Sequence, residues 1–223
     1  MNKGFCSWSG GKDSCLALHR ALQNGIEVTH LLTMFDETGL HSRSHAVSLE
    51  VMKAQADALG LKLVAPSASW KDYETVFIEN LRELKNEGCE IGIFGDIDLQ
   101  PHRDWEEKVC AKAGITAQLP LWNEKRLDLV EEFWREGFKS VVICVDEKFL
   151  GKEFCGRVFD ESFVRDLPEN VDECGENGEF HTFAFDGKLF KNSIDYKIAE
   201  IYHHKPSFPA ETISGYYFAK LTL

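Results

Sequence analysis

The strongest constraint on the fold is the regular alternation of short apolar runs and amphipathic segments in the first half of the chain. Apolar runs that fit buried strands cover residues 3–8, 28–35, 61–65 and 90–94. Segments with helical spacing cover residues 14–24, 45–59, 72–87 and 101–113, and a glycine stands just past each of them. Repeated strand and helix with short connections predicts an α/β domain with a doubly wound parallel sheet.

The second half has a different pattern. One amphipathic helix over 127–136 and one strand over 140–145 come first, and a hairpin is predicted around Asp186-Gly187. Two further strands are predicted over 196–203 and 214–223. We therefore expect an α/β domain over 1–124 and a smaller α+β domain over 125–223.

Composition excludes several classes of protein. The 223 residues carry a formal net charge of −12 and contain no block of Lys and Arg, which disfavours broad binding of DNA or tRNA. The longest apolar runs are far below the roughly 20 residues of a membrane span, and no stretch resembles a signal peptide. Seven cysteines without a C-x-x-C pair are interpreted as separate reduced thiols. A cytoplasmic location without membrane association is expected.

The first candidate site is Ser9–Ser14 (SGGKDS), directly between the first predicted strand and the first predicted helix. Gly10 and Gly11 allow a tight turn and a close approach of the backbone to an anion. The helix that follows offers N–H groups at its positive end, and Lys12 adds a positive charge. From the residues alone, a phosphate loop and a plain strand-to-helix turn both remain open. The spacing excludes a Walker A loop.

The second candidate site is Cys174–Thr182 (CGENGEFHT). Glu176 and Glu179 flank Asn177-Gly178, so a turn would present two carboxylates and an amide ahead of a strand with a histidine and a threonine. Such a loop could bind a cationic group or a metal, or orient ammonia. A solvated Asn-Gly turn is the alternative.

The SGGKDS motif resembles the loop of the PP-loop ATP pyrophosphatases, which cleave ATP to AMP and pyrophosphate. The resemblance implies that the loop holds the pyrophosphate portion of ATP, while backbone groups around Leu32 bind adenine at the end of the second strand. The ATP contacts it implies are Ser9, Gly10, Gly11, Lys12, Asp13, Ser14, Thr33, Met34 and Gly95. Asp96 ends the fourth strand, where ligands of parallel sheets sit, and with Asp13 it is the candidate ligand for Mg²⁺.

Four segments resemble the diphthine–ammonia ligase family in order and spacing, and together they span nearly the whole chain. They are Gly95-Asp96-Ile97 with Glu106, Val109 and Cys110; Pro120-Leu121-Trp122; Leu150-Gly151 with Gly156-Arg157; and Cys174–Thr182. The chain departs from the family's SDYQRxRxE pattern, because residues 98–106 read DLQPHRDWE. This departure concerns the macromolecular acceptor and leaves the ATP chemistry in place.

The resemblance implies an ATP-dependent amide ligase that adenylates a diphthine-like carboxylate and transfers ammonia to it, releasing AMP and pyrophosphate. Its cofactors would be ATP and Mg²⁺, and its partners ammonium and translation elongation factor 2 or a small carboxylate; a homo-oligomer is left open. The residues implied as catalytic are Lys12, Asp13, Glu176, Glu179 and His181. Those implied for the acceptor are Arg103, Glu106, Glu176, Asn177, Gly178, Glu179 and Thr182.

Two other functions stay open. One is a PP-loop ligase for a small metabolite or a tRNA base, of which the tRNA version is disfavoured by the acidic pI near 5.1. The other is a non-catalytic adenine-nucleotide sensor. Arg43 and His45 are either triphosphate contacts or surface residues at a helix start. Three tryptophans are expected to belong mainly to the core, namely Trp70, Trp105 and Trp134.

Overall fold

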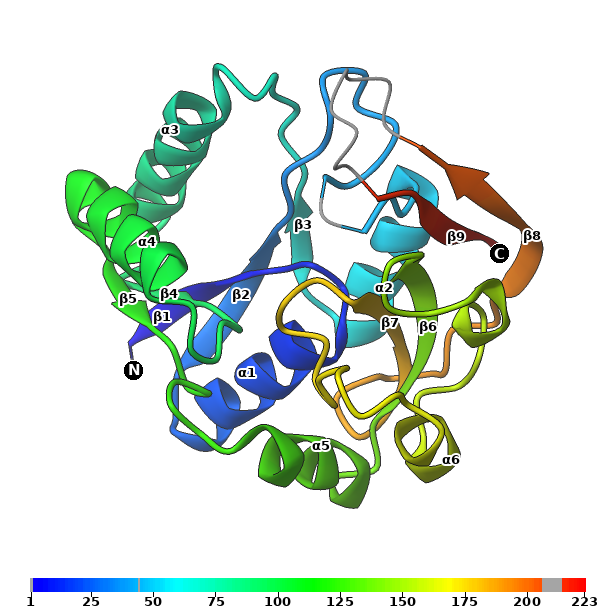
Figure 1. The fold of residues 1–223 in the computed structure, drawn as a ribbon. Helices are drawn as coiled ribbons and strands as arrows, with labels where there is room; N and C mark the ends of the chain where they lie inside the picture. Colours follow the sequence, from blue (N-terminus) through cyan, green and yellow to red (C-terminus); the bar gives the residue numbers. More distant parts are fainter. Residues whose placement is uncertain (1, 44, 206–213) are drawn as a thin grey trace. The chain divides into compact units, whose positions relative to one another are not determined.

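The computed structural model describes residues 2–43, 45–205 and 214–223. The chain divides into two compact units, Met1–Glu124 (unit 1) and Lys125–Leu223 (unit 2), each of which has its own sheet (Figure 1).

Unit 1 contains a five-stranded parallel sheet in the order β3-β2-β1-β4-β5. Its strands are β1 (Lys3–Ser7), β2 (Glu27–Leu32), β3 (Lys62–Val64), β4 (Ile91–Ile93) and β5 (Thr116–Gln118). The chain builds outward from β1 to β3 and then returns to the other side of β1 with β4. The predicted doubly wound sheet is confirmed, and the strand order reverses between β1 and β4, which is where such sheets bind ligands.

Four helices connect these strands: α1 (Lys12–Gln23), α2 (Leu49–Leu59), α3 (Tyr73–Asn86) and α4 (Gln100–Ala113). Two helix starts differ from the sequence prediction by more than one residue. Helix α1 begins two residues early, so that Lys12 and Asp13 belong to its first turn. Helix α2 begins four residues late, because Ala46 has a left-handed φ of 53° and the Ser48 side chain caps the helix by accepting from the Val51 N–H.

Helices α3 and α4 lie side by side on one face of the sheet (Figure 1). The core between them and the sheet contains Phe5, Phe77, Leu81, Phe94 and Val109, each at most 2% exposed. Each such side chain contributes about 1.5–3 kcal/mol through burial, so this layer holds the carboxyl ends of the strands rigidly. The short strand β5 was not predicted, because three residues are too few to show a period of two.

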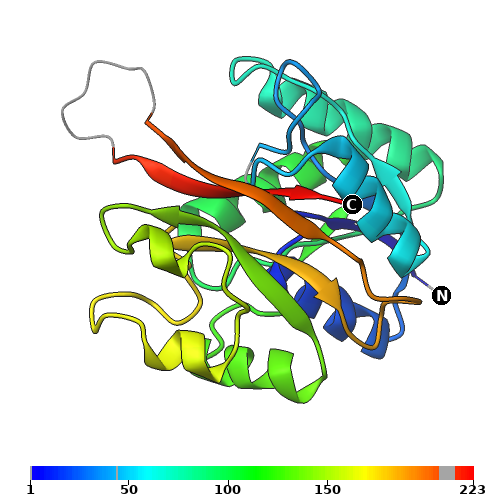
Figure 2. The same ribbon diagram turned by 90° about the vertical axis from the view of Figure 1, so that its right-hand side faces the viewer.

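Unit 2 contains a four-stranded antiparallel sheet in the order β7-β6-β9-β8. Its elements are α5 (Arg126–Arg135), β6 (Lys139–Asp146), η1 (Lys152–Phe154), α6 (Glu161–Arg165), β7 (Phe180–Asp186), β8 (Lys197–His204) and β9 (Tyr216–Thr222). Strands β8 and β9 form a long pair, drawn in orange and red in Figure 2.

The hairpin predicted at Asp186-Gly187 is wrong, because β7 pairs with β6 and β8 pairs with β9. Strand β6 is buried from Ser140 onward and accepts partners on both edges. Gly187 packs so closely against Phe138 that a Cβ would clash there. The Asp-Gly pair therefore ends β7 in a packed turn and starts no returning strand.

All seven cysteines lie in the described residues, and each is buried and outside any disulfide. This confirms the interpretation as separate thiols. Burial raises the pKa of Cys110 and of Cys155 to about 12, so both stay protonated at neutral pH. Among the described residues, we find no helix with the length and hydropathy needed to cross a bilayer.

The core assignment of Trp70 is wrong, because its side chain is 75% exposed. Trp70 follows β3 in a turn that Ser69 and Asp72 close through a 2.7 Å side-chain hydrogen bond and a backbone bond. A residue between these two positions projects outward from the turn. Trp105 and Trp134 are partly buried, as expected.

Candidate functional site

The conformation of the loop after β1 depends on Gly10 and on Gln55. Gly10 has φ +86°, a conformation that L side chains rarely adopt. Gln55 of α2 is fully buried, donates to the Gly10 carbonyl (2.9 Å) and accepts from the Trp8 indole N–H (2.7 Å). A side chain at Gly10 would meet the Gln55 oxygen, so the loop and α2 determine each other's position.

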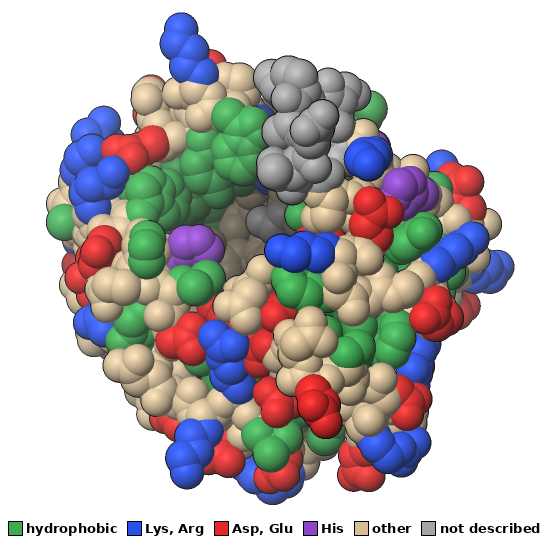
Figure 3. Space-filling model, viewed as in Figure 1, with side chains coloured by type: hydrophobic (Ala, Val, Ile, Leu, Met, Phe, Trp, Pro, Cys, Tyr) green, Lys and Arg blue, Asp and Glu red, His purple; other side chains and the backbone are tan. Residues whose placement is uncertain are grey.

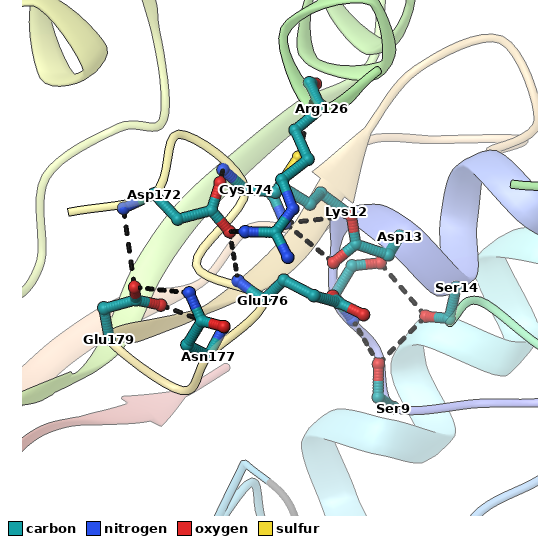
Figure 4. A network of polar contacts seen from close by, with 11 residues as sticks. Ser9, Lys12, Asp13, Ser14, Arg126, Asp172, Cys174, Glu176, Asn177 and Glu179 are labelled. Atoms are coloured by element: carbon teal, nitrogen blue, oxygen red, sulfur yellow. Dashed lines mark hydrogen bonds and ion pairs between the residues drawn. The ribbon is translucent and has the colours of Figure 1, made fainter. Parts of the chain in front are cut away.

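The hydroxyls of Ser9 and Ser14 meet at 3.1 Å at the start of α1, as Figure 4 shows. The Ser9 hydroxyl accepts from the Gly11 N–H, and the Ser14 hydroxyl also lies 3.1 Å from the Gly11 carbonyl. The first turn of a helix has N–H groups without an intrahelical partner and carries a partial positive charge. This arrangement fits an anion such as the pyrophosphate portion of ATP.

Lys12 and Asp13 are joined by an ion pair at the same helix start, with the Lys12 Nζ 2.9 and 2.7 Å from the two Asp13 oxygens (Figure 4). Burying a lysine that is paired with a carboxylate costs less free energy than burying an isolated charge. A bound phosphate would compete with Asp13 for Lys12, and Asp13 would then be available to a cation.

The end of β4 lies directly against the start of α1. A Cβ at Gly95 would be 2.9 Å from the Ser14 nitrogen and 3.0 Å from the Asp13 carbonyl carbon, so only glycine fits this approach. Asp96 follows and lies 2.7 Å from the His102 Nδ1. Burial alone would raise the pKa of Asp96, but hydrogen bonds with His102 and Glu106 outweigh it and lower the pKa.

The lowered pKa of Asp96 predicts how the stability of the fold depends on pH. Asp96→Asn should lower the melting temperature at pH 7 by about 2–4 °C, the effect of roughly 1 kcal/mol in a domain of this size. A carboxyl with a lowered folded pKa stabilises the fold above its ordinary pKa of 3.8, and that stability is lost as the pH falls through the folded pKa. The difference between parent and variant should therefore shrink below pH 3.8. A difference that is constant with pH would contradict the assignment.

At the end of β2, where adenine is predicted to bind, several backbone groups already make hydrogen bonds within the protein. The Thr33 N–H donates to the Val64 carbonyl, and the Thr33 hydroxyl donates to the Trp8 carbonyl at 2.6 Å. The Met34 carbonyl accepts from the Arg43 N–H. Thr33 therefore shapes the strand end. Met34 is the better backbone candidate for adenine, because its N–H donates no hydrogen bond to another described residue.

A Mg²⁺ ion fits only as a partner of phosphate. Within the described ranges no group of three His, Cys, Asp or Glu residues is arranged to hold a metal. Asp13 and Asp96 each engage a neighbouring side chain, Lys12 and His102 respectively. Mg²⁺ usually takes one or two carboxylates plus substrate phosphates and water, so Asp13 and Asp96 stay as its proposed ligands.

The acidic loop of unit 2 is organised by Asp172 and Glu179 (Figure 4). Asp172 is paired with Arg126 at 2.8 Å and accepts from the N–H groups of Cys174 and Glu176. Glu179 is 2% exposed and accepts from the N–H groups of Asp172 and Asn177 and from the Asn177 side chain. The two carboxylates brace the loop from inside.

The other residues predicted for this site separate into two groups. Glu176, Asn177 and Gly178 form the turn itself, and Gly178 has the left-handed φ of +86° that such a turn requires. His181 and Thr182 are neighbours on β7 and therefore point to opposite faces of the sheet. Thr182 is buried, so these two side chains do not share one face of the strand.

The remaining candidates lie at the carboxyl edge of the sheet of unit 1. Arg103 is paired with Glu107 at 2.7 Å and lies over the Trp122 ring, 4.9 Å from its centroid. Glu106 is buried on the inner side of α4. His45 is 8% exposed, which contradicts its interpretation as a surface residue at a helix start. Arg43 lies over the Trp70 ring at 4.3 Å.

Sequence reasoning missed the residues that hold both loops in shape, namely Gln55, Arg126 and Asp172. Gln55 was one polar position in a helical pattern, and its full burial is the feature that marks it. Asp172 lies two residues before Cys174, just outside the motif Cys174–Thr182. Gln55 bonds to the Gly10 carbonyl, which is distant in sequence, and Asp172 bonds to N–H groups of the turn that follows it. No local sequence pattern shows either contact.

Gln55→Leu should impair nucleotide binding more than stability. The change leaves the Gly10 carbonyl and the Trp8 N–H without their partner, at about 1–3 kcal/mol for each buried group, and it frees the loop. We expect ATP affinity to fall about tenfold or more while the variant remains folded, measured by calorimetric titration and thermal unfolding. Gln55→Glu, which keeps the acceptor for Trp8, separates the two bonds. Unchanged affinity in both variants would show that Gln55 does not set the loop.

Comparisons with known proteins cover both units. Residues 2–117 match the family model of the diphthamide synthase N-terminal domain, and residues 125–210 match that of the diphthamide synthase C-terminal domain. A mouse protein named diphthine–ammonia ligase is 28% identical over 225 residues, covering 88% of this chain and 83% of that protein. The human protein of the same name is 25% identical with the same coverage. A solved structure from Methanocaldococcus jannaschii, described as a predicted subunit of tRNA methyltransferase, has a TM-score of 0.45 at 21% identity, covering 63% of this chain and 80% of that chain.

Proposed function

Because this chain belongs to the diphthamide synthase family in both its N-terminal and its C-terminal domain, we propose that it amidates a diphthine-like carboxylate with ammonia at the expense of ATP. Membership of this family identifies the chain as an ATP-dependent amide ligase with a role in diphthamide synthesis. We further propose that the reaction adenylates the carboxylate and releases AMP and pyrophosphate.

The observation that supports the adenylation chemistry is the anion-binding start of α1 beside the end of β4. Ser9, Ser14 and the helix start form a cradle for phosphate oxygens, and Gly95 keeps the two segments in contact. A Walker A loop would lead to transfer of the terminal phosphate. A PP-loop that holds the pyrophosphate portion leaves the α-phosphorus open to attack instead.

The proposed reaction has two steps. A carboxylate oxygen of the acceptor attacks the α-phosphorus of ATP, and the bond to pyrophosphate breaks. The nitrogen of ammonia then attacks the acyl carbon, the bond to AMP breaks, and a carboxamide and a proton are released. Chemistry of this kind depends on positioning and on stabilisation of developing charge, without a protein nucleophile.

In unit 1, Lys12 and the N–H groups of the α1 start would stabilise the charge that develops on the leaving pyrophosphate. The backbone of Met34 would orient adenine. Asp13 and Asp96 would hold Mg²⁺, which neutralises phosphate charge when it is bound. The paired state of Lys12 and Asp13 supplies one cation for phosphate and one anion for the metal from adjacent positions.

In unit 2, Glu176, Asn177 and His181 would position the acceptor or ammonia. We assign Glu179 a different part from the one its motif indicates, because its carboxylate accepts three hydrogen bonds from its own loop. It is a positioning residue for that loop. Thr182 is buried in β7 and would support the strand.

The proposed acceptor is diphthine, a modified histidine on translation elongation factor 2, so that factor would be the protein partner. The relatives from mouse and human are named for diphthine, and the same acceptor is proposed here. An enzyme of net charge −12 is suited electrostatically to a factor that handles RNA.

The test is a product assay with a defined acceptor. Purified protein with ATP, Mg²⁺ and ammonium should release AMP and pyrophosphate when elongation factor 2 carries unamidated diphthine. The same factor already converted to the amide is the matched control and should give only background release. Mass spectrometry should show one carboxamide formed per AMP.

Two outcomes would overturn the proposal. AMP release that is equal with the amidated factor would separate ATP cleavage from this acceptor and favour a small carboxylate substrate. Nucleotide binding without any AMP release, with every acceptor offered, would favour a non-catalytic nucleotide sensor.

A further inference from the structure

Strand β8 is the last strand of the unit 2 sheet and is exposed over nearly its whole length. In the order β7-β6-β9-β8 it pairs with β9 alone, so its outer edge has no strand beside it within the described ranges. Every residue of β8 except Ile201 is exposed, Ile198 to 36% and Tyr202 to 37%. Figure 3 shows basic, acidic, histidine and hydrophobic side chains together on the surface at the right of the view, where Figure 1 draws β8. The backbone edge of β8 is therefore open to another strand.

The second half of β8 lacks most features that keep open edges from pairing. Such an edge presents unpaired N–H and C=O groups, and proteins usually block it with proline, with lysine or with a bulge. The register shift in β8 lies near its start, between Ile198 and Glu200. From Glu200 to His204 five residues pair regularly with β9, and none of them is proline, lysine or arginine. This regular stretch can accept a further strand.

One face of the regular stretch is aromatic. Tyr202 stacks on Phe218 of β9, with ring centroids 5.6 Å apart and an angle of 21° between the rings. Phe218 also lies 6.1 Å from the ring of Tyr216 and 6.4 Å from that of His204. Tyr202 is thus the ring of this cluster that stands in the edge strand. Aromatic pairs across neighbouring strands stabilise a sheet, so a strand that places a second ring opposite Tyr202 is favoured.

The sequence of β8 restricts how two copies of the strand could pair. Antiparallel strands related by a twofold axis pair symmetrically about one residue, and opposed side chains share a face. A centre at Glu200 puts two carboxylates directly opposite each other, which is destabilising. A centre at Ile201 matches His203 and His204 with residues on the far side of the register shift. Neither register suits the strand.

The register centred on Tyr202 uses the whole regular stretch. Each Glu200 carboxylate then faces the His204 ring of the other copy, and an imidazole N–H can donate to a carboxylate in either charge state. Tyr202 faces its own copy, so the stack of Tyr202 on Phe218 continues across the axis. Because of the symmetry, the pair of Glu200 and His204 occurs twice.

We propose that the outer edge of β8 pairs with the β8 edge of a second copy of this chain, antiparallel and centred on Tyr202, to form a homodimer. The two unit 2 sheets then form one continuous sheet across the twofold axis, and neither copy keeps this open edge. Twofold dimers are the commonest assemblies of soluble chains. The stretch from Glu200 to His204 contains none of the residues proposed for ATP or for the acceptor, so this inference does not depend on the proposed function.

Analytical ultracentrifugation of the full chain over a series of concentrations measures the assembly. The parent should approach twice the chain mass of 25.3 kDa. Tyr202→Lys puts two ammonium groups opposite each other at the axis and should raise the dimer dissociation constant about 3- to 30-fold. Leu127→Lys, at an exposed leucine on α5, adds the same charge elsewhere on unit 2 and should keep the parental dissociation constant. Thermal unfolding of both variants shows that the fold persists.

An exchange of partners tests the register. His204→Glu places a carboxylate opposite Glu200 at two symmetrical positions and should raise the dissociation constant about 3- to 30-fold. Adding Glu200→His to this variant exchanges the two partners and should restore the dimer. Within one chain Glu200 faces Lys220 and His204 faces Tyr216, so recovery in the double variant reports pairing between two copies.

Cysteine cross-linking reads the register directly. The side chains of Tyr202→Cys lie opposite each other across the axis, where Cβ atoms of opposed residues are about 4.5–5.5 Å apart, and copper–phenanthroline should join them into a disulfide-linked dimer. Glu200→Cys carries its thiol two residues from the axis and should give no linked dimer. The seven native cysteines are buried and leave both variants with one accessible thiol.

Three results contradict the proposal. A parent that stays monomeric at every concentration would leave the edge of β8 to an extended segment of another protein. A dimer that persists unchanged in Tyr202→Lys would place the interface elsewhere on the chain. Cross-linking of Glu200→Cys in place of Tyr202→Cys, or no recovery in the double variant, would show that the strands do not pair about Tyr202.

Discussion

Lys12→Ala is expected to reduce AMP release by about 10²- to 10³-fold while the protein remains folded. Loss of one group that stabilises developing charge commonly costs this much in rate. Lys12 stands in the first turn of α1, where its Nζ meets both Asp13 oxygens. Removing it takes one positive charge from the phosphate site while the Asp13 carboxylate stays, so the site attracts ATP less strongly and assists the leaving pyrophosphate less.

The measurement is single-turnover release of AMP and pyrophosphate at saturating acceptor, with ATP affinity determined separately by titration. Lys53→Ala, at an exposed lysine on α2, changes the net charge equally and should keep parental rates. Asp13→Asn tests the other half of the pair and should also depress turnover, with a stronger dependence on Mg²⁺ concentration. Parental AMP release in both Lys12→Ala and Asp13→Asn would show that the start of α1 is not the phosphate site.

Glu179→Ala is expected to depress amide formation by about 10²-fold and to leave ATP affinity within a few-fold of the parent. The change removes an acceptor of three hydrogen bonds, from the Asp172 and Asn177 N–H groups and the Asn177 side chain. Each buried group that loses its partner costs about 1–3 kcal/mol. The turn that carries Glu176 and Asn177 would lose its shape, and a displacement of about 1 Å can cost 10²-fold in rate.

A substitution series decides between positioning and direct catalysis at this residue. Glu179→Gln keeps one oxygen as an acceptor, and a positioning role predicts partial recovery of activity relative to Glu179→Ala. A role as acid or base predicts that Gln is as inactive as Ala. Glu169→Ala, at an exposed glutamate ten residues earlier, is the matched control and should behave as the parent. An ATP affinity that collapses in Glu179→Ala would move this loop from the acceptor to the nucleotide.

Sequence patterns were sufficient for the parts of the fold that depend on local periodicity. Four of the five parallel strands and all four helices of unit 1 lie where spacing and glycine stops indicate. The two candidate loops also stand out in the sequence, because Gly10 and Gly178 are needed for left-handed backbone and no larger residue would serve. Backbone requirements of this kind depend on consecutive residues, so the sequence alone indicates them.

What the sequence by itself determined is therefore the α/β class, the loop at the start of α1 and its resemblance to a nucleotide-cleaving family. The tertiary structure decided the pairing of β8 with β9 and the burial of Gln55 against the Gly10 loop. It also decided that the Glu179 carboxylate accepts hydrogen bonds from its own loop. It also decided that Trp70 is exposed. These features depend on which groups the packed fold brings together, because a buried polar atom takes whichever partner lies within hydrogen-bond distance.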